Sequence, residues 1–288
     1  MRLEKLQELE SDTWWRLPWP AADENWRAWR SGLGHVVLES PELCSQPDSQ
    51  TCLHALQLGL MAPWQLPARL ALREQSLHLQ VAWKTEAPPE EVERALPADL
   101  QVTQNLLAQW AQEEPQPAPE QDEVSAPEPQ ALQAIRAIMV LLEQDPELGP
   151  LSELDDDTAE LVIAGSDDDE LLILMRPLPS GPQAYQVAVM LPQILLPVDE
   201  PARLDSLRQH LQRNDAVQIG PQLQWVADAG GQQLFLQGLF DPQTGNLEDL
   251  RLLLARLLAL DAELSGEGSA PSAAYLDHLH LHLSAIRG

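Results

Sequence analysis

The spacing of apolar positions in the second half of the chain predicts a defined order of helices and strands. Leu132, Ile135 and Ile138 recur at helical spacing, and Asp145-Pro146 ends that helix. Short apolar runs separated by Gly, Asp and Pro are typical of strands. The predicted elements are, in order, a helix over 132–142, strands over 159–164, 170–175 and 185–191, a helix from Pro201, strands over 222–227 and 233–240, and a leucine-rich helix after Asn246.

The first half is also predicted to be α+β. Segments 34–40, 52–61 and 70–83 have the apolar content of strands, and the last contains the turn REQS. Within it, LHLQVAW alternates between apolar and more polar positions, as expected of a strand with one buried face. Pro88-Pro89-Glu90 begins a helical stretch that extends to about Trp110 and is interrupted or kinked at Pro97.

A proline-rich acidic stretch divides the two halves. EEPQPAPEQDEVSAPEPQ contains five prolines, and Val124 is its only sizeable apolar residue, so it has little to bury. We therefore expect two α+β domains. The predicted division is a Trp-rich domain over 1–112, a linker over 113–129, a second domain over 130–266 and a C-terminal tail over 267–288.

The charge excludes some partners. The net charge is −28, and residues 113–170 carry 18 acidic side chains against one basic one. Such a chain is a poor ligand for nucleic acid, because phosphate contacts need clustered Lys and Arg. No stretch of 18 apolar residues is present, so no membrane insertion is expected. The start lacks the pattern of a secretory signal, and Cys44 and Cys52 are the only cysteines. We expect a cytoplasmic protein with two free thiols, with a disulfide between them as the alternative.

Several segments of the second half carry a family resemblance. They are the acidic turn before ELLILM, the passage YQVAVMLPQILLPVDEP, and QLQWVADAGGQQLFLQGLFDPQTGNL before the last helix. With the order α-βββ-α-ββ-α and an antiparallel sheet, residues 130–264 resemble a class I type III secretion chaperone of the CesT/SycE kind. The N-terminal domain carries no such resemblance.

The resemblance implies a function without catalysis. Chaperones of this family are acidic cytosolic homodimers that hold a segment of a secreted effector in an export-competent state. The implied partners are a secreted effector or a secretion-apparatus protein, in a homodimer or a hetero-oligomer. The alternative is a structural or regulatory adaptor of a bacterial secretion apparatus, because family members usually lack the preceding Trp-rich domain. An enzyme with an unrecognised site is a third hypothesis.

Two groups of residues are candidates for partner binding. Aromatic and arginine side chains are frequent interface anchors, and five tryptophans lie close together among arginines in WWRLPWPAADENWRAWR. The alternative is that these rings pack on the domain's own sheet. In the second domain the candidates are apolar side chains of the predicted strands and of the broad apolar face of the last helix. The candidates are Trp14, Trp15, Trp19, Trp26, Trp29, Val187, Val189, Phe235, Leu253 and Leu260.

No pattern in the chain indicates catalysis or a cofactor. A phosphate-binding glycine loop, a nucleophile elbow and a zinc-protease helix are all missing from the sequence, so we nominate no catalytic residue. His278, His280 and His282 would share one face of a strand and could bind zinc there, whereas a structural or solvent-exposed role is the alternative. The acidic triplets 155–157 and 167–169 lack the spacing of an EF-hand loop and are predicted to be solvated turns. We therefore expect no resident metal.

Overall fold

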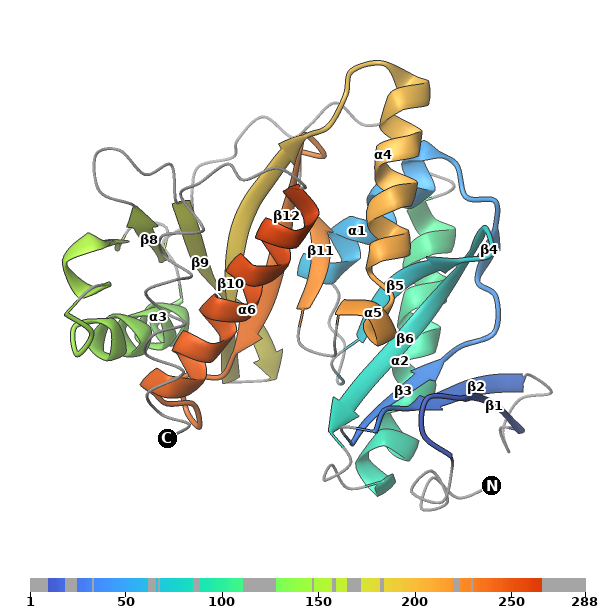
Figure 1. Ribbon diagram of the computed structural model, residues 1–288, viewed down its shortest axis with the longest axis horizontal. Helices are drawn as coiled ribbons and strands as arrows, with labels where there is room; N and C mark the ends of the chain where they lie inside the picture. The colour runs from blue at the N-terminus through green and yellow to red at the C-terminus, as the bar shows by residue number, and fades with distance from the viewer. Residues whose placement is uncertain are drawn as a thin grey trace. The chain divides into compact units, whose positions relative to one another are not determined.

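A computed structural model of the chain has an α+β fold with two antiparallel sheets, which confirms the predicted class. Figure 1 shows the arrangement of the elements. The described residues are 10–18, 25–32, 34–61, 66, 68–84, 89–110, 128–146, 148–156, 159–164, 172–181, 184–219, 223–228 and 230–265. The predicted linker, except for its last two residues, and the predicted tail lie outside them.

The first sheet is built from the N-terminal half. Its strands are β1 (Trp14–Pro18), β2 (Asn25–Arg30), β3 (His35–Glu39), β4 (Cys44–Ser45), β5 (Ala68–Arg73) and β6 (Ser76–Lys84). Their order is β1-β2-β3-β6, and both β5 and the short β4 also pair with β6. The helices of this half are α1 (Ser49–Met61) and α2 (Pro89–Trp110). Pro97 lies inside α2.

The second sheet is built from the C-terminal half. Its strands are β7 (Ser152–Asp155), β8 (Glu160–Ala164), β9 (Leu172–Gly181), β10 (Ala184–Leu195), β11 (Leu223–Ala227) and β12 (Gln233–Phe240), in the order β11-β12-β10-β9-β8-β7. The helical elements are α3 (Pro129–Leu142), η2 (Gly149–Leu151), α4 (Glu200–Arg213), α5 (Ala216–Ile219) and α6 (Leu247–Ser265). Every element predicted for this half is present, and β7, η2 and α5 are additional.

Two segments of the first half differ from their predictions. Residues 52–61, predicted as a strand, belong to helix α1. A short run rich in apolar residues, here interrupted by His54 and Gln57, fits a buried helix as well as a strand, and Asp48 caps this helix by accepting a hydrogen bond from the Thr51 N–H at 2.8 Å. The tryptophan-rich segment, given no element in the prediction, forms the antiparallel hairpin β1–β2.

The chain is organised as two compact units whose boundaries differ from the predicted domains. Unit 1 comprises Met1–Pro119 and Ile194–Leu234, and unit 2 comprises Glu120–Gln193 and Phe235–Gly288. The prediction had assigned 194–234 to the second domain. These residues belong to unit 1 because α4 packs against α1 and β5, and β11 packs against α1 (Figure 1).

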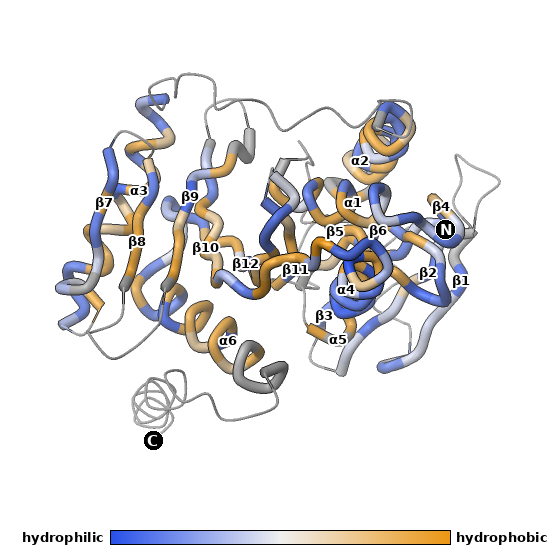
Figure 2. Tube along the Cα trace, turned by 90° about the horizontal axis from the view of Figure 1, so that it is seen from above, coloured by the Kyte–Doolittle hydropathy of each residue, from blue (hydrophilic) through white to orange (hydrophobic). Residues whose placement is uncertain are grey.

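The packing of α4 depends on only a few apolar residues. Most of its length is hydrophilic, as Figure 2 shows, and Leu207 and Leu211 are its fully buried leucines. Polar contacts complete its attachment within unit 1. The Asn214 amide donates to the carbonyls of Leu70 in β5, at 3.2 Å, and Trp225 in β11, at 3.0 Å. Directional bonds of this kind fix the position of α4 more narrowly than its two leucines would alone.

Candidate functional site: the β1 edge

Two tryptophans of the hairpin belong to the protein's own fold. Trp14 stands opposite Trp29 in the β1–β2 register, and both rings are half-buried. They pack with Val37 of β3 and Ala82 of β6, and Ala216 of α5 belongs to the same cluster. Trp14 and Trp29 therefore pack on the domain's own sheet, which was the alternative to partner binding.

Trp15 and Trp26 lie on the opposite face of the sheet from Trp14 and Trp29, and they differ in burial. Trp26 is 2 % exposed and is a core residue, whereas Trp15 is 37 % exposed. Trp19 lies outside the described residues. Of the tryptophans predicted to bind a partner, Trp15 is therefore the one that the structure offers most fully to solvent.

Trp15 continues a buried apolar row out to the edge of the first sheet. It stands opposite Ala28, which pairs with Leu38, which pairs with Val81, and those three residues are all fully buried. Strand β1 has no neighbour on its outer side in the described part of the sheet. An edge with unpaired main-chain groups and an apolar anchor can accept an extended segment as an additional strand.

The other sheet edges are less suited to that role. Strand β5 is covered by α4, and every residue of β11 is buried, with α1 packed against the strand. Strand β7 is an open edge of sequence SELD, in which Glu153 and Asp155 are exposed and acidic. Among the described edges, β1 thus combines an open side with a large exposed apolar ring.

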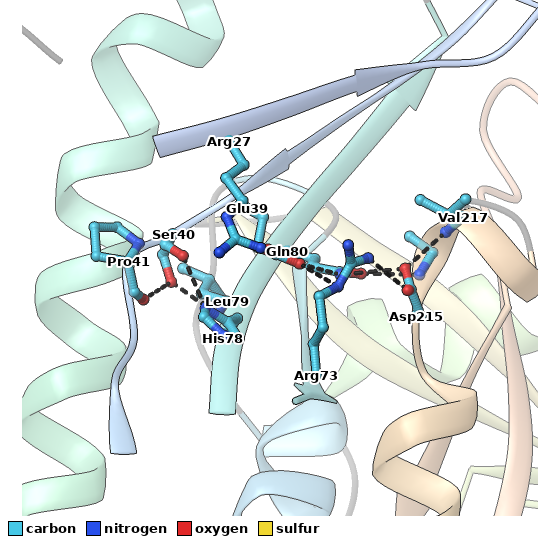
Figure 3. A network of polar contacts seen from close by, with 11 residues as sticks. Arg27, Glu39, Ser40, Pro41, Arg73, His78, Leu79, Gln80, Asp215 and Val217 are labelled. Atoms are coloured by element: carbon cyan, nitrogen blue, oxygen red, sulfur yellow. Dashed lines mark hydrogen bonds and ion pairs between the residues drawn. The ribbon is translucent and has the colours of Figure 1, made fainter. Parts of the chain in front are cut away.

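A buried polar network lies behind the hairpin (Figure 3). The Glu39 carboxylate is fully buried and lies 3.2 Å from Arg73 Nε and 3.7 Å from Arg27 Nη1. It also accepts a hydrogen bond from Gln80 Nε2 at 2.9 Å. Asp215 pairs with Arg73 Nη2 at 2.6 Å, so that Arg73 lies between two carboxylates.

This network joins α5 to the sheet and supports the hairpin. Gln80 Oε1 accepts the Ala216 N–H at 2.8 Å, which holds the first residue of α5. The Arg73 guanidinium also lies 4.1 Å from the centroid of the Trp14 ring, within the range of a cation–π contact. Burying a charge is costly unless it is paired, and Arg73 supplies that pairing for Glu39. The arrangement therefore links β3, β5, β6 and the start of α5 beside the open edge.

The candidate residues of the second half lie mainly in the core. Val187 and Val189 are fully buried, and Phe235 and Leu253 are 8 % and 5 % exposed. Leu260 is half-buried. Among the leucines of α6 whose side chains are described, Leu252 is the most exposed, at 40 %, and the sequence pattern did not single it out.

A second exposed apolar group was also missed by the sequence analysis. Ile194, Leu195 and Val198 are 42 %, 75 % and 99 % exposed, where β10 leads into α4. The run ILLPV follows the strand predicted over 185–191, and the sequence analysis did not name it as a candidate for binding. Its exposure makes it a secondary candidate for contact with another protein.

The described thiols and histidines do not form a reactive centre. Burial raises the pKa of Cys52 to about 12, and burial with Asp48 and Glu42 nearby raises the pKa of Cys44. Both cysteines are free, and both thiols stay protonated at neutral pH. Within the described ranges, no three His, Cys, Asp or Glu side chains are grouped so that they could hold a metal ion. His278, His280 and His282 lie outside those ranges.

Comparisons of the chain with models of protein families, with curated proteins and with solved structures gave no match. No helix among the described residues is long and apolar enough to cross a membrane.

Proposed function

We propose that this protein is a non-enzymatic binding protein that resembles a type III secretion chaperone. In this proposal it holds an extended segment of a secreted effector in the bacterial cytoplasm and keeps that segment competent for export. The observation that carries the proposal is the open edge of β1, where Trp15 extends a buried apolar row to the rim of the sheet.

The element order of the second half supports the same proposal. From α3 to α6 it follows one helix, three strands, one helix, two strands and one helix, once the additional β7, η2 and α5 are set aside. This is the order on which the family resemblance rests. The proposal extends the binding role to the first half, because the open edge with an exposed tryptophan lies there.

The chemistry of the β1 edge indicates what kind of segment would bind. Main-chain hydrogen bonds along the edge supply affinity for any extended chain, and the Trp15 ring favours an apolar side chain beside it. Arg16 stands opposite Arg27 in the register, and like charges directly across a sheet repel. An added strand with a carboxylate near Arg16 is therefore favoured over a basic one.

A structural or regulatory adaptor of the secretion apparatus is the second candidate function. It is favoured by the separate exposed apolar group formed by Ile194, Leu195 and Val198, since an adaptor needs a second surface for a second protein. In that case the lasting partner is a component of the apparatus, and the β1 edge binds a regulatory segment or nothing.

The test is co-purification of the full chain from its native cell, followed by binding measurements with the purified partner. Trp15→Ser is the informative variant, and Val140→Ser is a matched control because Val140 is 56 % exposed on α3. A secreted partner whose binding is weakened by Trp15→Ser and not by Val140→Ser supports the chaperone function. An apparatus component as partner supports the adaptor. Equal binding by both variants contradicts the assignment of the β1 edge.

A further inference from the structure

The same order of strands and helices occurs twice in the chain. Once the two-residue β4 and the four-residue α5 are set aside, the first half contains β1, β2, β3, α1, β5, β6 and α2, and the second contains β8, β9, β10, α4, β11, β12 and α6. In each sheet, the fifth strand of the series lies between the third strand and the fourth strand. The strand orders are β1-β2-β3-β6-β5 and β8-β9-β10-β12-β11.

The middle helices of the two series also begin alike. Asp48 caps α1 by accepting the N–H of Thr51 at 2.8 Å, and Asp199 caps α4 by accepting the N–H of Ala202 at 3.2 Å. Both bonds span three residues, as expected for a capping aspartate. The two caps give a common starting point from which positions along α1 and α4 can be matched.

The contacts between the two series are reciprocal within unit 1. Helix α1 of the first series packs against β11 of the second, α4 of the second packs against β5 of the first, and α1 packs against α4. Figures 1 and 2 both show these four elements side by side. A contact in which each partner uses the same surface is what a two-fold symmetric dimer forms.

Hydrogen bonds between the two series start from equivalent positions of the two helices, whereas the accepting carbonyls differ in place, since Asp228 follows β11 and Pro47 precedes α1. Nine residues after its cap, α1 carries Gln57, whose Nε2 donates to the Asp228 carbonyl at 3.0 Å. Nine residues after its own cap, α4 carries Arg208, whose Nη2 donates to the Pro47 carbonyl at 2.7 Å. Equivalent positions on the two helices thus each hold a main-chain carbonyl of the other series.

We infer that the chain is a tandem duplication of one βββ-α-ββ-α module, and that the two copies pair with each other inside a single chain. The surface of pairing, here called the seam, is formed by α1 and β5 of the first copy and by α4 and β11 of the second. The partner that this surface fits is a second copy of the same module. The linker supplies that copy in cis, so a second chain is not needed at the seam.

Gly59 gives the seam a sharp probe. A Cβ atom at Gly59 would lie 2.6 Å from Cγ1 of Val226 in β11, closer than carbon atoms approach one another. Alanine has a higher helix propensity than glycine, so Gly59→Ala favours α1 itself. Weaker pairing in this variant would therefore arise from the seam and not from loss of the helix. Gly32→Ala is the control, because its nearest atom would be 3.8 Å away.

The experiment uses the full chain with a protease recognition sequence inserted between Pro119 and Glu120. We expect the intact chain to be a monomer of about 32.0 kDa by light scattering. After cleavage, a tag on the N-terminal fragment should still retain the C-terminal fragment. Gly59→Ala should weaken that retention about 10-fold or more, as overpacking of a closely packed contact does. Gly32→Ala should leave it unchanged.

Two results would overturn the inference. Fragments that separate on cleavage, while each keeps its circular dichroism, would show that the seam does not hold the copies together. An intact chain with the mass of two chains, reduced to one by Gly59→Ala, would show that the copies pair between chains.

Discussion

Asn214 offers a direct measurement of how the end of α4 contributes to stability, through one hydrogen bond across the seam to β5 and two within the second copy to β11. The residue is 2 % exposed, and its amide bonds to both β5 and β11. Its Nδ2 donates to the carbonyls of Leu70 and Trp225, and its Oδ1 accepts the N–H of Trp225. The substitution Asn214→Ala removes all three hydrogen bonds and adds no bulk.

The three losses are unequal, and their sum sets the expected decrease in the free energy of unfolding. The Trp225 N–H is a single donor in a buried position, so losing its acceptor costs about 1–3 kcal/mol. Each carbonyl has a second lone pair, so the loss of one bond there costs about 0.5–1.5 kcal/mol. We therefore expect Asn214→Ala to lower the free energy of unfolding by about 2–6 kcal/mol, if no water takes the vacated place.

The assay is urea denaturation of the full chain, followed by circular dichroism and by tryptophan fluorescence, since Trp225 is 1 % exposed. Asn105→Ala is the matched control, because Asn105 is exposed on α2, where a surface change shifts stability by less than about 0.5 kcal/mol. If Asn214→Ala and Asn105→Ala gave the same urea midpoint and slope, the hydrogen bonds of Asn214 would contribute nothing measurable to stability, and the reasoning would be refuted.

Three further predictions concern other parts of the described chain. Gly231 has φ +63°, a conformation that L residues adopt at a cost, whereas Gly32 has no positive φ. In thermal unfolding, Gly231→Ala should therefore destabilise the protein by about 1–2 kcal/mol, and Gly32→Ala by less. Burial lowers the pKa of His210 below its ordinary value of 6.5, so the unfolded chain binds a proton there more readily than the folded one. The stability contributed by neutral His210 is present above pH 6.5 and is lost as the pH falls below it, and His210→Gln should flatten this part of a pH–stability curve. Burial raises the pKa of Cys52 to about 12, so iodoacetamide at neutral pH should leave this thiol unmodified until urea is added. Mass spectrometry locates the label, and rapid labelling of Cys52 in the native protein would contradict its burial.

Local patterns in the sequence predicted most of the second half. The strand pair β11–β12 follows from two apolar runs around a Gly-Gly turn, and α4 follows from an aspartate cap with Pro201 in the first turn. These features depend on neighbouring residues alone, so a single sequence contains them. Residues 52–61 of helix α1 were predicted as a strand because they are rich in apolar residues, although the capping residue Asp48 was present as a signal of a helix.

The tertiary grouping could not be predicted in the same way. Periodicity shows that α4 has an apolar stripe at Leu207 and Leu211, but it does not show which surface covers that stripe. The candidate site has a similar limit. Trp15 and Trp26 lie on the same face of the sheet, and they differ in burial because β1 is the outer strand and β2 an inner one, which the residues beside each ring do not show. The duplication escaped notice because the two modules keep the order of elements while their sequences differ.

The seam and the open edge are connected through the topology of the sheets. Each module has five strands in the same order, so each would present two edges if it stood alone. The seam covers β5 with α4 and packs α1 against β11, which removes one edge from each module. In the second module β7 pairs with β8 and occupies the other edge with an acidic strand. In the first module no described strand does the same for β1. Pairing the two copies thus leaves the tryptophan-bearing edge as the part of the fold most available to a partner strand.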